Sequence, residues 1–203
     1  MFADPPTRRN RVWQTDFSEL ESLAGGIWRM SGVVDYWAKL CLACPVTTTQ
    51  TSGDAISAVQ AAIGQAELLL GCSLLEDCTD PSTGEVTPLV IVTDNGPAYR
   101  SVGFARFVAS RPELVHVRTR HRSPQTNGVI ERFYQAIKYE DLYRHDIGDG
   151  LVLAERVASY LTVYNTIRPH EAIGFDVPLA RYLQAPSTPP GANLHSPESV
   201  SES

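Results

Sequence analysis

The sequence lacks the features that mark a membrane protein or a secreted protein. No stretch among its 203 residues approaches ~18 uncharged apolar residues, so no membrane span is expected. The N-terminus, MFADPPTRRNR, has no apolar segment after its charges and does not resemble a secretory signal. A cytoplasmic location is therefore expected. At 43% hydrophobic and 20% charged residues, the chain is typical of one globular domain.

Cysteine is also scarce, and the four that occur do not suggest a disulfide framework. Cys41 and Cys44 form a C-x-x-C pattern in an apolar, strand-like run, where positions three apart should point to opposite faces. Cys72 and Cys78 are poorly spaced to complete a metal site. Core thiols are therefore favoured over the alternative of a zinc site.

Positive charge is in deficit, with 17 Lys and Arg against 23 Asp and Glu, a net charge of −6. This balance argues against a nucleic-acid partner. The basic residues nevertheless crowd one short region, which a local patch could use to bind phosphates. A solvated arginine-rich loop is the alternative. The region contains Arg118, Arg120, His121, Arg122, Arg132 and Lys138.

Residues 123–138 predict a helix with two distinct faces. Thr126, Asn127 and Gly128 supply helix-entry chemistry. Glu131 and Gln135 then fall on one stripe with Lys138, so that a carboxylate, an amide and an ammonium line one exposed edge. Such an edge suits a site that handles phosphodiesters. The apolar stripe expected to face the core holds Ile130, Phe133, Tyr134 and Ile137.

The remaining pattern predicts an α/β fold with a mixed sheet between helices. An antiparallel meander is expected at residues 12–18, 27–34 and 38–47, a buried strand at 88–93 and another strand at 114–117. Helices are expected at 54–71, 99–110, 151–164 and 178–183. Residues 72–88 read as an acidic surface loop.

Three segments are expected along the chain. Residues 1–11 form a basic flexible segment, residues 12–183 the folded core, and residues 184–203 a disordered tail rich in Pro and Ser.

Three carboxylates have the right setting for chemistry. Asp16 lies mid-strand, Asp94 ends a buried strand at the edge where α/β sheets bind ligands, and Glu131 lies near a helix start. Each alone has an ordinary explanation as a strand acid, a turn former or a helix-dipole partner. Together they offer the hard oxygen ligands that Mg²⁺ prefers.

Four motifs occur in order along the chain: WQTDFS, VTDNGPAY, SPQTNGVIERFYQAIK and YNTIRPHEAIGFDVP. Over residues 11–183 they resemble the DDE integrase/transposase catalytic core of bacterial insertion-sequence transposases and, more distantly, retroviral integrases. The resemblance implies an RNase H-like, mixed five-stranded sheet flanked by helices, in which strands one to three are antiparallel and four and five parallel. It also implies cleavage and joining of DNA strands with two Mg²⁺ or Mn²⁺ ions.

The resemblance assigns roles residue by residue. Asp16, Asp94 and Glu131 match the catalytic, metal-binding carboxylates, and Lys138 matches a lysine that contacts DNA near the reacting phosphate. Gln125 lies in a loop that touches DNA in relatives. The segment YNTIRPH is expected to be mainly structural. The other residues expected to position DNA are Gln135, Arg120, His121, Arg122 and Arg132, with a general base as the alternative role for His121.

Two departures concern the spacing of the carboxylates. Asp16 and Asp94 are separated by 77 residues, longer than the family usually shows, and the excess maps onto residues 72–88. A surface loop absorbs such an insertion at little cost. Asp35, at a strand end, is the rival first carboxylate. Asp16 is preferred because an acid in mid-strand beside a buried acid needs a partner ion.

The resemblance also implies partners. The first is DNA, both as the ends of the mobile element and as the target. The second is another copy of the chain, in a dimer or a larger assembly. The expected location is the bacterial cytoplasm, in association with the nucleoid. No helix-turn-helix pattern precedes the core, so the region that recognises element ends is expected to be separate or missing. A catalytically idle remnant that keeps the fold, and a nuclease acting on RNA–DNA hybrids, are the alternatives.

Overall fold

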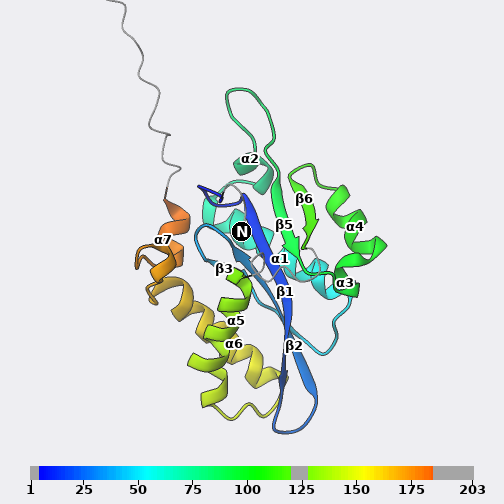
Figure 1. Ribbon diagram of the computed structural model, residues 1–203, viewed down its shortest axis with the longest axis vertical. Helices are drawn as coiled ribbons and strands as arrows, with labels where there is room; N and C mark the ends of the chain where they lie inside the picture. The colour runs from blue at the N-terminus through cyan, green and yellow to red at the C-terminus, as the bar shows by residue number, and fades with distance from the viewer. Residues whose placement is uncertain (1–4, 120–127, 185–203) are drawn as a thin grey trace, which may run out of the picture.

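A six-stranded mixed sheet forms the centre of the computed structural model, which describes residues 5–119 and 128–184 (Figure 1). The strand order is β3-β2-β1-β5-β6, and β4 pairs with β2 beside this path. The strands are β1 (Val12–Glu21), β2 (Ile27–Asp35), β3 (Cys41–Ala43), β4 (Val46–Thr47), β5 (Leu89–Thr93) and β6 (Leu114–Arg118).

The pairing confirms the predicted α/β class and its mixed sheet. β1 with β2 and β2 with β3 are antiparallel, whereas β1 with β5 and β5 with β6 are parallel. The count of five strands was wrong, because the strand expected at 38–47 is divided. Pro45 has no N–H for a ladder and separates β3 from β4. Its carbonyl still accepts the Ser31 N–H at 3.0 Å, which keeps this edge beside β2.

Helices cover both faces of the sheet, as predicted. The region expected to form one helix at 99–110 forms two, because Ser101 interrupts it and caps the second by accepting the Phe104 N–H at 3.0 Å. No described helix is long and apolar enough to cross a membrane. The helices are α1 (Ser52–Leu70), α2 (Leu74–Cys78), α3 (Pro97–Arg100), α4 (Val102–Ala109), α5 (Gly128–Glu140), α6 (Gly150–Thr166) and α7 (Pro178–Leu183), with 3-10 turns η2 (Leu142–Arg144) and η3 (Glu171–Ile173).

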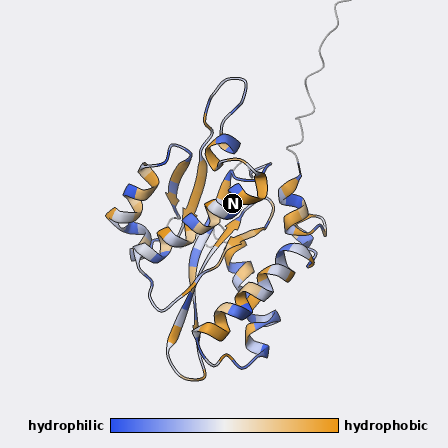
Figure 2. Cartoon of the chain, turned by 180° about the vertical axis from the view of Figure 1, so that it is seen from behind, coloured by the Kyte–Doolittle hydropathy of each residue, from blue (hydrophilic) through white to orange (hydrophobic). Residues whose placement is uncertain are grey.

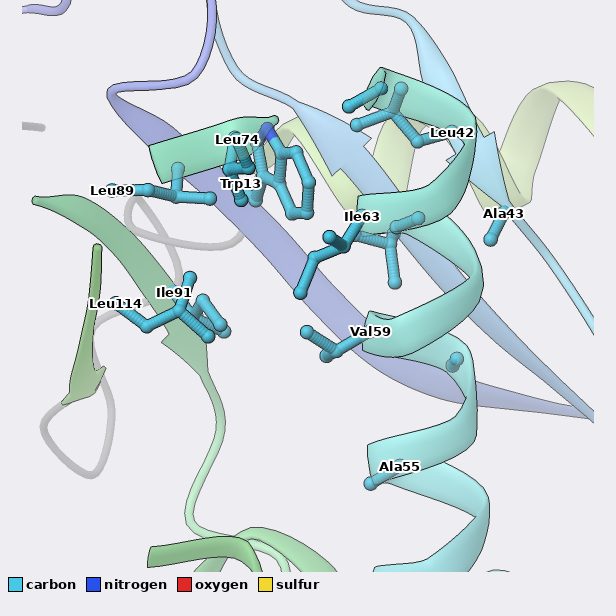
Figure 3. Close-up of a cluster of buried hydrophobic side chains, with 14 of the residues drawn as sticks. Trp13, Leu42, Ala43, Ala55, Val59, Ile63, Leu74, Leu89, Ile91 and Leu114 are labelled. Atoms are coloured by element: carbon cyan, nitrogen blue, oxygen red, sulfur yellow. The ribbon is translucent and has the colours of Figure 1, made fainter. Parts of the chain in front are cut away.

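Two apolar cores lie on opposite faces of the sheet. Trp13 and Ile91 point from the strands toward Ile63 of α1 in the first core (Figure 3). In the second, Met30 and Val34 of β2 pack with α5 and α6. Because side chains alternate along a strand, the odd-numbered Trp13 of β1 faces α1. The even-numbered positions of β1 therefore face α5.

The hydropathy of the chain follows this layering, with apolar residues concentrated on the strands and on the inner sides of the helices (Figure 2). The buried face of α1 is rich in alanine, which lets this helix approach the sheet closely. Thr51 and Asp54 form a capping box at the start of α1. Gly71 ends it at a φ of +70°, a conformation that glycine adopts without steric cost.

The two cysteines of the C-x-x-C pattern lie on the same side of the sheet, so the prediction of opposite faces was wrong. Cys41 and Cys44 both pack in the second core. The register between β2 and β3 shifts at Val33 and Val34, and β3 ends at Ala43, so strict alternation does not extend to Cys44. Both are buried free thiols.

The insertion at residues 72–88 is more than a surface loop. It contains α2, whose Leu74 is buried in the first core and whose Ser73 forms a capping box. Asp77 accepts hydrogen bonds from Arg9 at 3.2 Å and Asn10 at 3.0 Å. The stretch beyond α2 is exposed and projects from the molecule (Figure 1). Burial of Leu74 explains why this part of the insertion is ordered against the core.

The predicted flexibility of residues 1–11 and disorder of residues 184–203 stay predictions, and residues 1–4 and 185–203 lie outside the described part of the chain. Within residues 5–11, Arg9 donates to the carbonyls of Tyr182 and Gln184 at 3.2 and 3.0 Å. Asn10 is fully buried and accepts hydrogen bonds from Trp13 and Tyr182. Residues 9 and 10 therefore contact α7, which lies near the other end of the sequence.

Asp35 holds the turn between β2 and β3. Its side chain is fully buried, with Oδ1 accepting the Ala38 N–H at 2.7 Å and Oδ2 the Asn10 N–H at 2.9 Å. Burial raises the pKa of Asp35 to about 6, although these N–H groups oppose the rise. Asp35 pairs with Trp13 in the sheet, three positions along β1 from Asp16. Its contacts are those of a structural acid.

A first prediction concerns Gly150, the first residue of α6. It is buried, and a Cβ added there would overlap the ring of Trp28. Gly150→Ala should lower the free energy of unfolding by about 1–3 kcal/mol, because overpacking outweighs the ~1 kcal/mol gained in helix propensity. Urea denaturation measures the change.

Gly64, exposed in α1, is the matched control, because a Cβ added there meets no heavy atom within 4 Å. Gly64→Ala should raise the free energy of unfolding by about 0.5–1 kcal/mol. Equal stabilisation by both substitutions would contradict the packing of Trp28 on α6.

A second prediction concerns the pH dependence of stability. Since the pKa of Asp35 is about 6 in the folded chain, against 3.8 ordinarily, the folded state holds this proton more tightly between these values. The contribution of Asp35 to the free energy of unfolding should therefore fall as pH rises from 4 to 6, by about 2–3 kcal/mol. Asp35→Asn should be less stable but show a flatter slope in urea denaturation across this window. An unchanged slope would exclude Asp35 as the titrating group.

Candidate functional site

The sheet brings the first two predicted carboxylates to neighbouring strands. β1 and β5 run parallel, with Gln14 opposite Val92. Continued two residues beyond this pairing, the same register brings Asp16 and Asp94 to the same end of the two strands, with Asp94 just after the end of β5. Asp16 shares the α5-facing side of β1 with Gln14, because residues two apart on a strand share a face. The pair thus lies where α5 crosses the sheet.

Asp16 is half-buried, and its electrostatics link all three carboxylates. Burial raises its pKa to about 6, partly offset by the Phe17 N–H, which donates to Oδ1 at 2.8 Å. The negative charges of Asp94 and Glu131 raise this pKa further. Asp94, in the loop after β5, and Glu131, on α5, therefore lie within electrostatic range of Asp16 on β1.

The loop after β5 holds Asp94 in place. Its Oδ1 accepts the Gly96 N–H at 2.8 Å. A Cβ added at Gly96 would lie 2.9 Å from the same oxygen, so a side chain there would crowd the carboxylate. Thr93 and Asn95 tie the loop to β6: Thr93 Oγ1 lies 2.9 Å from His116 Nε2, and Asn95 donates to the Thr119 carbonyl at 2.6 Å.

Glu131 lies in the first turn of α5 and is exposed, while its helix is fixed to the sheet by two polar side chains. Gln14 Oε1 accepts the N–H groups of Val129 and Ile130, each at 3.1 Å. The Tyr134 hydroxyl accepts the Gly32 N–H at 2.6 Å and lies 2.6 Å from the Asp16 carbonyl. Gln14 lies on β1 two residues before Asp16, and the Tyr134 hydroxyl contacts the Asp16 carbonyl.

The chemistry of these donors fits a divalent cation. Mg²⁺ and Mn²⁺ take hard oxygen ligands, and Mg²⁺ keeps several waters beside a few carboxylates. A cation would relieve the mutual repulsion that contributes to the raised pKa of Asp16. Across residues 5–119 and 128–184, however, no three His, Cys, Asp or Glu side chains form a ready-made ligand group. The carboxylates are neighbours in an open arrangement.

The predicted DNA-positioning residues are divided between described and undescribed parts of the chain. Gln135 and Arg132 are exposed on α5, and Lys138 is half-buried on the same helix. Burial lowers the pKa of Lys138, and the nearby charge of Glu19 partly offsets this. Gln125, Arg120, His121 and Arg122, together with the expected helix cap at Thr126 and Asn127, lie outside the described residues.

The YNTIRPH segment makes structural contacts at the far end of α5. Arg168 donates to both oxygens of Glu140, at 2.6 and 2.8 Å. Asn165 spans the backbone of Cys41, accepting its N–H at 3.1 Å and donating to its carbonyl at 2.9 Å. This amide occupies hydrogen-bonding groups of the edge strand β3. The first contact links the segment after α6 to α5, and the second links α6 to the edge strand β3.

Sequence reasoning missed Gln14, Gly96 and the hydroxyl of Tyr134. Tyr134 was predicted as an apolar core residue, and it is buried, but its hydroxyl also forms hydrogen bonds with backbone groups of β1 and β2. One signal was available for Gln14, which lies two residues before Asp16 and therefore shares its face. A buried polar side chain there requires a partner.

The chain is similar in sequence to known proteins. Residues 113–178, which include β6, α5 and α6, match the family described as integrase core domain. The chain is 29% identical over 190 residues to the putative transposase InsD of insertion element IS2E from Escherichia coli strain K12, covering 87% of this chain and 80% of that protein. The transposase InsD of IS2A/D/F/H/I/K from Escherichia coli is also 29% identical, and there the chain spans 58% of the relative's length.

Solved structures share the fold. One is the simian T-cell lymphotropic virus intasome in complex with the PP2A regulatory subunit B56 gamma, with a TM-score of 0.68 at 20% identity, covering 98% of this chain and 63% of that one. Another is the HTLV-2 integrase catalytic core domain in complex with magnesium, in trimeric form. Its TM-score is 0.61 at 22% identity, covering 86% of this chain and 97% of that one. The chain is therefore similar to integrase and transposase cores in part of its sequence, and it shares the fold of an integrase catalytic core.

Proposed function

We propose that this chain is the catalytic core of a DNA transposase that cleaves DNA and joins the freed 3′ end to a target strand. The observation that supports the proposal is that Asp94 and Glu131 lie close enough to Asp16 for their negative charges to raise its pKa. The similarity to InsD transposases gives the class of substrate. No covalent protein–DNA intermediate is needed, because water and a DNA hydroxyl serve as the nucleophiles.

Asp16, Asp94 and Glu131 would hold two Mg²⁺ or Mn²⁺ ions. Bound ions of this kind activate an attacking oxygen and stabilise a leaving one during in-line phosphoryl displacement. The chain's own contribution is to fix the carboxylates. The strand pairing sets Asp16 and Asp94, the Gly96 N–H orients Asp94, and α5 presents Glu131. The magnesium named for the HTLV-2 core supports a divalent cation in this fold.

DNA would lie along the exposed edge of α5 beyond Glu131. Lys138 would contact a phosphate, which would compete with Glu19 for its ammonium group. Gln135 and Arg132, both exposed, would hold the backbone on either side. Gln125, Arg120, His121 and Arg122 would extend this contact from the preceding segment. Because the net charge is −6, binding by the core should be weak and depend strongly on salt.

The partners follow from the same proposal. DNA would be engaged both as element ends and as target, and recognition of the ends would come from a separate helix-turn-helix region. Two DNA ends require at least two copies of the chain. The dimeric and trimeric forms named for the HTLV-2 core support such assembly in this fold.

A catalytically idle remnant that keeps the RNase H-like fold is the second candidate. It is favoured by the open arrangement of the carboxylates, since no ready-made three-residue ligand group occurs in residues 5–119 and 128–184. Such a chain would fold normally and would bind metal ions weakly or not at all.

The first test of function is a nicking and strand-transfer assay on short DNA duplexes with Mn²⁺ or Mg²⁺, against EDTA. Asp16→Asn, Asp94→Asn and Glu131→Gln should each lower the rate by about a hundredfold or more, because carboxylates that act as a unit fail together. Glu155→Gln, which neutralises an exposed acid on α6, should keep the wild-type rate.

Full activity in Asp16→Asn together with loss in Asp35→Asn would show that the first carboxylate is Asp35. If the wild-type chain is inactive with either metal, the assay is repeated with the chain fused to a generic DNA-binding domain, which adds affinity for DNA. An inactive fusion would favour the remnant.

Metal binding can be measured without DNA. Mn²⁺ should raise the melting temperature of the wild type, because only the folded chain brings the carboxylates together. Asp16→Asn and Glu131→Gln should reduce this rise, and Glu155→Gln should retain it. A rise without strand joining would indicate a folded but idle site, whereas no rise at millimolar Mn²⁺ would contradict the metal site itself.

A further inference from the structure

The start of α5 is held by a side chain from the centre of the sheet. Helix N-termini leave N–H groups without intrahelical partners, and a nearby Ser, Thr, Asp or Asn usually accepts them. In this chain Gln14 Oε1 accepts two of them, from Val129 and Ile130, across 115 and 116 residues of sequence. Gln14 is fully buried, so its hydrogen bonds to these two N–H groups are shielded from bulk water.

The side chain of Tyr134 holds the same helix one turn later. The Tyr134 hydroxyl accepts the Gly32 N–H at 2.6 Å and lies within hydrogen-bonding distance of the carbonyls of Asp16 and Met30, at 2.6 and 2.9 Å. Gly32 is opposite Asp16 in the β1–β2 ladder. A Cβ at Gly32 would lie 2.9 Å from this hydroxyl, so the absence of a side chain makes room for it.

The contacts of these two side chains lie on either side of Glu131 along α5. Ile130 precedes it by one residue and Tyr134 follows it by three, and on the sheet the anchors lie two residues from Asp16 and on the Asp16 carbonyl. The apolar face of α5 would by itself allow small sliding or rotation, because hydrophobic contact is not directional. Hydrogen bonds are directional and remove that freedom.

We propose that Gln14 and Tyr134 are positioning residues that fix the carboxylate of Glu131 relative to Asp16. The inference rests on the proposed metal-dependent function, and it adds the means by which an exposed glutamate on a separate helix is placed. Side chains that orient metal ligands typically alter metal affinity 10- to 100-fold when they are removed. Neither residue would touch the ion or the DNA.

The structural half of the inference is tested by amide exchange. Gln14→Met keeps the size of the side chain but removes its acceptor, so the N–H groups of Val129 and Ile130 should exchange faster in NMR measurements. Gln14→Glu retains an acceptor and should restore their protection. Unchanged exchange in Gln14→Met would overturn the role of Gln14.

The functional half is tested by Mn²⁺ titration of the whole chain, followed by electron paramagnetic resonance, which needs no DNA. Gln14→Met and Tyr134→Phe should each weaken Mn²⁺ binding by about tenfold. In the Glu131→Gln background neither change should weaken it further, because both act through Glu131. A merely structural role would give additive losses instead.

Val59→Ala is the control for general destabilisation. Val59 is fully buried in the first core, on the opposite face of the sheet, and its truncation should lower the melting temperature without changing Mn²⁺ affinity. If Glu131→Gln weakens binding but Gln14→Met and Tyr134→Phe do not, the positioning inference is wrong and the metal site stands. If the wild type does not bind Mn²⁺, or Glu131→Gln binds it normally, the proposed site itself is wrong.

Discussion

The parallel pairing of β1 with β5 is the constraint on which the candidate site depends. It brings the ends of the two strands that carry Asp16 and Asp94 together although 77 residues separate these acids in the sequence, and the insertion between them does not interrupt the pairing. Raising the pKa of Asp16 to about 6 is the electrostatic consequence, because burial and two neighbouring carboxylates disfavour its charge. A site with this charge balance is suited to binding a cation.

The placement of α5 is the second requirement, and it is met by polar contacts added to an apolar face. Ile130 and Phe133 bury that face, while Gln14 and the Tyr134 hydroxyl fix its position over β1. The far end of α5 is held by the ion pair between Glu140 and Arg168. That pair is partly exposed and contributes little stability on its own, so its value lies in orientation.

Short sequence windows were sufficient to predict most of the helices and strands, because periodicity and strand-end residues are local properties. The end of α1 at Gly71 and the span of α7 are examples. The catalytic role of the three carboxylates stays a prediction. What could not be predicted depends on residues far apart in sequence. The bond from Gln14 to α5, the packing of Leu74 from the insertion and the shift that brings Cys41 and Cys44 to one face all arise from tertiary contacts.

Anomalous diffraction from crystals of the whole chain soaked in Mn²⁺ would locate a bound cation directly. We expect an anomalous peak between Asp16 and Asp94, within about 2–2.5 Å of a carboxylate oxygen of each, with Glu131 turned toward it. A well-ordered crystal whose only peaks lie elsewhere, for example beside Asp35 or Asp77, would contradict the assignment of the site.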